Sequence, residues 1–236
     1  MGGLYDRVTA GTLGMGEFRI SVNAWRGAVG TEARPCEQTL PGSIRRRVTP
    51  LGRRALAAAW SLAPEQNTRF IFSSRHGEYS RTFSMLQTLA GEGTVSPADF
   101  SMSVHHALAG LMSIAMGNRQ GHTALAAGPD PFGYGLMEAA ACLSERPGDP
   151  VLLVHYDEPL PDAYAGFADG DAGTVLALSL QPPQGAGDIE VQATPGTVEA
   201  PRQSEDLAAA FLAFLCSSEP EAACRGDRMM WRWRRV

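Results

Sequence analysis

The chain has 236 residues and a formal net charge of −5, with 44% hydrophobic and 19% charged residues. This length and composition suffice for one large globular domain with a substantial core. The acidic balance argues against non-specific binding to nucleic acid. The four cysteines form neither a CxxC pair nor a zinc-ligand pattern with histidine. We therefore expect no metal, no cofactor and no disulfide framework.

No apolar run approaches the length of a membrane span, and the first residues, MGGLYDRV, lack the apolar segment of a signal peptide. These features predict a cytoplasmic protein without a membrane span. Residues 1–17 are glycine-rich and are predicted to be a flexible leader. We expect the main domain at 18–180. A strand and helix extension should follow at 181–236, and it closes with Trp231-Arg-Trp233-Arg-Arg.

Helical patterns alternate with strand patterns along the main domain. The predicted elements are a strand at 18–25, a helix at 50–62, a strand at 69–74, helices at 79–90 and 103–116, a strand at 122–124, a helix at 132–143, strands at 151–156, 172–180 and 188–193, and a helix at 204–215. Residues 151–156 are apolar without interruption, which is typical of a strand covered on both faces. The alternation indicates a layered α/β fold.

Residues 100–128 form the most informative stretch. Residues 103–116 carry small or apolar side chains on nearly every helical face, which predicts a buried central helix. Gly117-Asn118 then closes that helix. A short strand leads into the turn Leu125-Ala126-Ala127-Gly128 before the next helix. Such a strand-to-helix turn can hold a side chain at a helix N-terminus, where nucleophiles are commonly activated.

The order SVHHALAGLMSIAMGN…HTALAAG resembles the N-terminal half of a beta-ketoacyl synthase of the thiolase superfamily. Members of that family read roughly Thr-Ala-Cys-x-Ser-Gly at the turn, and the Cys carries the acyl chain. Four positions of this sequence match that pattern, namely Thr123, Ala124, Ala126 and Gly128. Leu125 stands where the Cys would be. The two histidine motifs of the family's second half, His-Gly-Thr and Gly-His-x-x-Gly-Ala-Ala, are absent.

The resemblance covers about 18–180 and implies a thiolase-like half fold, a layered mixed sheet with a buried central helix, that has no catalytic residue. A chain-length-factor-like subunit of polyketide, aryl polyene or fatty-acid-type assembly has these properties. It would form a heterodimer with a full-length ketosynthase and reach an acyl carrier protein through that complex. The strand before the turn would then pair with the partner through Gln120, Gly121, His122, Thr123 and Ala124.

Two further groups of residues follow from the same resemblance. The candidate acyl-tunnel or gate residues are Phe100, Met102, His105, Leu108 and Met112. The candidate contacts to a carrier protein are Arg45, Arg46 and Arg47. Arginine suits phosphate geometry, but a solvated helix start explains the three residues equally well.

Two other functions stay open at this level. The first is a small stand-alone acyl hydrolase or malonyl decarboxylase that uses a Ser or His, although Gly-x-Ser-x-Gly is absent. The second is a carrier-protein-binding scaffold without effect on chain length.

His76 is expected to be a loop residue, and Glu158 a structural acid at a strand end. A lone half fold should expose an apolar face that another protein covers, so we expect poor solubility of the chain alone.

Overall fold

The computed structural model describes residues 16–30, 40–167, 173–196 and 206–236. Most of the predicted leader and Cys36 lie outside these ranges. In the described part, eight strands form one mixed sheet in the order β3-β2-β4-β5-β1-β6-β8-β7. β2, β3 and β4 run parallel to one another, and all other neighbours are antiparallel. The predicted α/β class with a layered mixed sheet is confirmed.

The strands are β1 (Glu17–Val29), β2 (Arg69–Ser73), β3 (His122–Leu125), β4 (Val151–Tyr156), β5 (Thr174–Gln181), β6 (Ile189–Pro195), β7 (Glu221–Arg225) and β8 (Met229–Arg235). The helices are α1 (Gly42–Arg45), α2 (Pro50–Ser61), α3 (Tyr79–Glu92), α4 (Pro97–Met102), α5 (Ala107–Met116), α6 (Pro131–Glu145), the 3-10 helix η2 (Asp162–Phe167) and α7 (Leu207–Cys216). Within these ranges, no helix combines the length and apolar character that crossing a bilayer requires.

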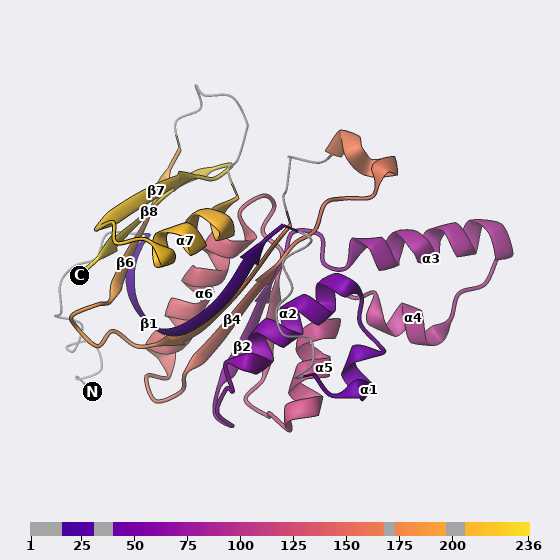
Figure 1. Ribbon diagram of the computed structural model, residues 1–236, viewed down its shortest axis with the longest axis horizontal. Helices are drawn as coiled ribbons and strands as arrows, with labels where there is room; N and C mark the ends of the chain where they lie inside the picture. The colour runs from indigo at the N-terminus through magenta and orange to yellow at the C-terminus, as the bar shows by residue number, and fades with distance from the viewer. Residues whose placement is uncertain (1–15, 31–39, 168–172, 197–205) are drawn as a thin grey trace, which may run out of the picture.

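Two apolar cores lie on opposite faces of the sheet. α6 and α7 cover one face, and α2 and α5 cover the other face over β2, β4 and β5 (Figure 1). All six residues of β4 are buried, because this strand lies between both cores. The prediction made from its uninterrupted apolar run is therefore confirmed.

The burial predicted for residues 103–116 is wrong. α4 ends at Met102 and α5 begins only at Ala107. One face of α5 packs on the sheet, but Ile114 on another face is 80% exposed. The apolar residues on the remaining faces of α5 therefore contribute no core to this chain. α2 and α6 each have eight buried residues, and α6, which follows the β3 turn, is called the central helix below.

The C-terminal residues extend the same sheet, since β6 pairs with β1 and β8 pairs with β6. Trp231 is fully buried against α6, and a Cβ atom built on Gly133 would lie 2.3 Å from its indole ring. The ring of Trp233 packs against Phe211, with centroids 5.3 Å apart. The Trp/Arg tail is thus part of the core. It closes over α6, so this face of α6 is covered by the chain itself.

Candidate subunit interface and the turn before the central helix

The turn between β3 and α6 spans residues 126–130, close to the predicted position. Leu125 is the last residue of β3 and stands at a sheet-to-helix junction, as expected. α6 begins at Pro131, one residue before the predicted start, because proline fits the first turn of a helix and Gly128 adopts a positive φ of 58° before it. The residue that precedes the first turn of α6 is therefore Asp130.

Asp130 is a structural carboxylate. It is 2% exposed, and it accepts hydrogen bonds at 2.9 and 3.1 Å from the backbone N–H of Asp227 in the β7–β8 turn. Burial raises its pKa, and the backbone hydrogen bond from Asp227 opposes that shift. A Cβ atom on Gly226 would lie 2.2 Å from one of its oxygens. Asp130 therefore ties the turn to the hairpin, and no residue from Leu125 to Pro131 is a Cys, Ser or Thr.

A row of three side chains, Ser73, His155 and Asp157, lies beside this turn, and no local sequence pattern predicts it. The Oγ atom of Ser73 is 3.2 Å from Nδ1 of His155, and Nε2 of His155 is 3.5 Å from Oδ2 of Asp157. Ser73 is fully buried and His155 is 4% exposed, with the ring of Phe132 packed against the imidazole. Because no acyl group can reach the hydroxyl in this packing, the arrangement does not favour a hydrolase.

The carboxylates after β4 hold the loop between β2 and α3. Asp157 accepts hydrogen bonds from the hydroxyl of Ser74 at 2.8 Å and from the backbone N–H of Arg75 at 3.0 Å. Glu158 accepts a hydrogen bond from Ser80 at 2.6 Å. Both carboxylates therefore have structural roles.

In the described residues, no group of three or more His, Cys, Asp or Glu side chains could hold a metal ion.

The strand β3 lies at the edge of the sheet, with β2 as its neighbour. The backbone N–H of Ser74 donates to the carbonyl of Leu125 at 3.1 Å, so the polar groups of Leu125 point toward β2. Along a strand this direction alternates from residue to residue. The N–H and C=O groups of His122 and Ala124 therefore point away from the sheet. No other described strand pairs with this edge, and such a free edge is a template for a strand of another chain.

The predicted pairing residues divide between a loop and this strand. Gln120 and Gly121 precede β3, whereas His122, Thr123 and Ala124 belong to it. The rings of His106 and His122 stack with centroids 6.4 Å apart. Burial and the neighbouring His106 lower the pKa of His122, which favours uncharged imidazole at neutral pH. His122 itself therefore adds no charge beside the edge, whereas Glu138 of α6 accepts a hydrogen bond from Thr123 at 3.3 Å.

The structure does not bring together the five candidate gate residues Phe100, Met102, His105, Leu108 and Met112. Leu108 and Met112 are 1% and 0% exposed and belong to this chain's own core. Met102 packs partly against that core, and Nε2 of His105 lies 3.0 Å from the carbonyl oxygen of Ser74. Phe100 alone presents a large apolar side chain to the outside, with 64% exposure.

The three candidate arginines are exposed at the end of α1 and just after it. The guanidinium of Arg81 in α3 donates to the carbonyl of Arg47 at 2.7 Å and to the carboxylate of Asp99 at 3.2 Å. The segment with Arg45, Arg46 and Arg47 therefore adjoins the start of α3 and α4.

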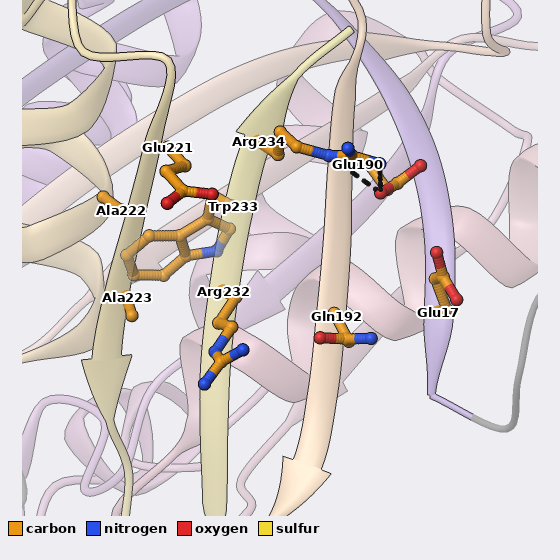
Figure 2. Close-up of a pocket in the computed structure, with 9 residues that line it drawn as sticks. All are labelled: Glu17, Glu190, Gln192, Glu221, Ala222, Ala223, Arg232, Trp233 and Arg234. Carbon is orange, nitrogen blue, oxygen red and sulfur yellow. Dashed lines mark hydrogen bonds and ion pairs between the residues drawn. The ribbon is translucent and has the colours of Figure 1, made fainter.

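A second surface lies on the uncovered face of β1, β6, β8 and β7, where a concave region encloses about 650 Å³ (Figure 2). Glu190 accepts hydrogen bonds there from Arg19 at 2.8 Å and from Arg234. These bonds, first from Arg234 and then from Arg19, lower the pKa of Glu190. Glu190 is thus paired with arginines of both neighbouring strands, and the other charged side chains of the lining suit this face to contact with water.

Comparisons with known proteins agree on one family. The model described as "Beta-ketoacyl synthase, N-terminal domain" matches residues 22–234. A chain of the complex of the ketosynthase ApeO with its chain length factor ApeC, from Xenorhabdus doucetiae, has a TM-score of 0.78 and 24% identity to this chain. The match covers 92% of this chain and 99% of that one. No curated protein matches by sequence.

Two other solved structures are similar over less of their length. The ishigamide ketosynthase/chain length factor has a TM-score of 0.59 and 13% identity, covering 84% of this chain and 72% of that one. A type II ketosynthase in complex with its acyl-carrier protein, AntDE:AntF, has a TM-score of 0.57 and 12% identity, covering 76% and 70%. The predicted thiolase-like fold is therefore confirmed.

Proposed function

Because the chain belongs to the family of beta-ketoacyl synthase N-terminal domains, we propose that it is a non-catalytic, chain-length-factor-like subunit that pairs with a full-length ketosynthase. One observation carries the proposal. At the turn where the family's nucleophile is expected, Leu125 ends β3 and the buried Asp130 precedes α6. Neither side chain can form a thioester, so the partner must supply the chemistry.

The free edge of β3 and the solved complexes support the choice of partner. The similar structures named above include two complexes of a ketosynthase with a chain length factor. The matched chain in the first of these is about as long as this chain, as its 99% coverage implies. The complex would act in the cytoplasm in type II polyketide or aryl polyene assembly. It would receive acyl groups from a carrier protein, and Arg45, Arg46 and Arg47 are candidate contacts.

Co-expression with a full-length ketosynthase, followed by incubation with labelled acyl-carrier protein, tests the proposal. We expect the two chains to co-purify and the label to become attached to the ketosynthase alone. Covalent label on this chain would contradict the proposal, as would its purification as a monomer that binds no ketosynthase. If the chain alone hydrolyses the thioester of acyl-carrier protein, that result would instead support the alternative function as an acyl hydrolase.

We expect Phe100 to control product length, because among the five candidate gate residues it has the most exposed large apolar side chain, at 64%. Truncating this exposed ring by Phe100→Ala is expected to lengthen the partner's product, because a bulky side chain at a tunnel wall limits depth by its volume. The measurement is the distribution of product lengths by mass spectrometry.

Met112→Ala is the matched comparison for this experiment. Met112 is fully buried in the chain's own core, so its truncation should cost about 2–5 kcal/mol of stability without a specific change in product length. An unchanged product distribution with Phe100→Ala would remove Phe100 from the gate.

A further inference from the structure

α3 and α4 form an arm that extends from the body of the molecule (Figure 1). Among their described side chains, neither helix contains a buried residue. Leu86 and Leu89 on α3 are 46% and 48% exposed, and Phe100 on α4 is 64% exposed. A helix of the length of α3 is only marginally stable in water by itself. Its apolar side chains therefore require a surface that the described part of this chain does not provide.

The sequence of this region lacks the charges that a solvated surface carries. From Thr82 to Asn118, only Glu92 and Asp99 are charged among 37 residues, whereas 19% of the whole chain is charged. The buried centre of a protein–protein interface is depleted in charged residues in the same way. Residues 82–118 therefore include exposed helices, but their low content of charged residues is like that of a protein–protein interface.

The edge strand by itself is too small for a stable complex. β3 has four residues, which span about 13 Å at the usual rise per residue. A stable interface buries about 800 Å² on each partner, so the contact must continue beyond the strand. α5 packs against β3 and also contacts α4. It exposes Ile114 by 80%, and Val104 between α4 and α5 is 40% exposed. These side chains connect the free edge to the arm.

The base of the arm is held by the body. The carboxylate of Glu78, just before α3, accepts the backbone N–H of Thr49 at 2.9 Å and also its hydroxyl. The ring of Tyr79 packs edge-to-face on Tyr164 at 5.1 Å between centroids. Leu86 and Leu89 lie beyond these contacts, two turns or more along α3. A fixed base with an uncovered outer part suits a segment that a partner covers.

We propose that the α3–α4 arm is a docking element whose apolar side chains are covered, and whose helices are stabilised, by the same ketosynthase subunit that pairs with β3. This inference rests on the proposed function. It adds that the arm contributes most of the apolar contact and that α3 gains stability only in the complex.

Charge substitutions on the arm test the inference. The double variant Leu86→Glu/Leu89→Glu should weaken binding to the ketosynthase at least about 100-fold, while the melting temperature of the chain alone stays unchanged because neither side chain is buried. Val236→Glu is the matched control, since Val236 is 45% exposed at the C-terminus and should bind like the wild type. Hydrogen exchange should show fast exchange of the α3 amides in the free chain. Protection should increase at least tenfold in the complex.

The outcomes separate the two proposals. Two results would contradict the docking role of the arm while leaving the proposed function intact. One is wild-type affinity of the double variant for the ketosynthase, and the other is equal hydrogen exchange of the α3 amides with and without the ketosynthase. A wild-type chain that binds no ketosynthase would overturn both. A concentration-dependent homodimer that is lost with Leu86→Glu/Leu89→Glu would show that a second copy of this chain, not a ketosynthase, covers the arm.

Discussion

Ala124→Pro is expected to reduce binding to the ketosynthase by about 10- to 100-fold or more while the chain itself stays folded. The N–H of Ala124 points to the free edge of β3, as the bond from Ser74 to Leu125 implies. Proline removes this donor and places its ring where the partner strand would lie. A buried acceptor left without its partner costs about 1–3 kcal/mol, and about 1.4 kcal/mol corresponds to tenfold in affinity.

Thr123→Pro is the control for that experiment, because the N–H of Thr123 points toward β2. Its loss should lower the melting temperature of the chain alone, which Ala124→Pro should not do to the same extent. Titration of the purified ketosynthase with each variant measures the affinity. Wild-type affinity with Ala124→Pro would show that β3 does not pair with the partner.

The second large effect concerns stability. Trp231→Ala is expected to lower the free energy of unfolding by about 3–5 kcal/mol, the usual cost of removing a buried aromatic ring. The indole is fully buried, it packs on Gly133 in the first turn of α6, and its ring lies 5.7 Å from that of Tyr134 between centroids. Its removal opens a cavity between the C-terminal hairpin and the central helix.

Urea unfolding of Trp231→Ala beside Arg232→Ala measures this effect. The side chain of Arg232 is exposed on the opposite face of β8, so its removal should change the free energy of unfolding by no more than about 0.5 kcal/mol. Equal losses in the two variants would show that the hairpin does not close the core over α6.

Helices and strands that follow from local sequence patterns were predictable. Contacts that depend on how the strands pair in the sheet were not. Residues 151–156 form a buried strand as expected from their uninterrupted apolar run. The contact between Ser73 and His155 depends on the register of β2 with β4, which no local pattern contains. Asp130 could have been found, since Pro131 marks the first turn of α6 and the residue before it takes the cap position.

The predictions for α5 and for the Trp/Arg tail differ from the structure for the same physical reason. Composition indicates that a surface avoids water, but it does not indicate which molecule covers that surface. α5 is apolar on several faces and buries only one of them in this chain. The Trp-Arg-Trp-Arg alternation has the period of a strand with one apolar face, and that face covers α6 within the chain.

The charged side chains at the far end of the sheet have a consequence for how large an assembly can grow. β7 is the other outer strand of the sheet, and Glu221 and Arg225 on it, with Arg234 on β8, surround that end with charge. Ionic side chains along an outer strand discourage a further chain from joining it. If a partner joins across β3 as proposed, the charges at β7 disfavour growth at the other end, and the sheet would then be complete as a pair and would not continue into a fibre.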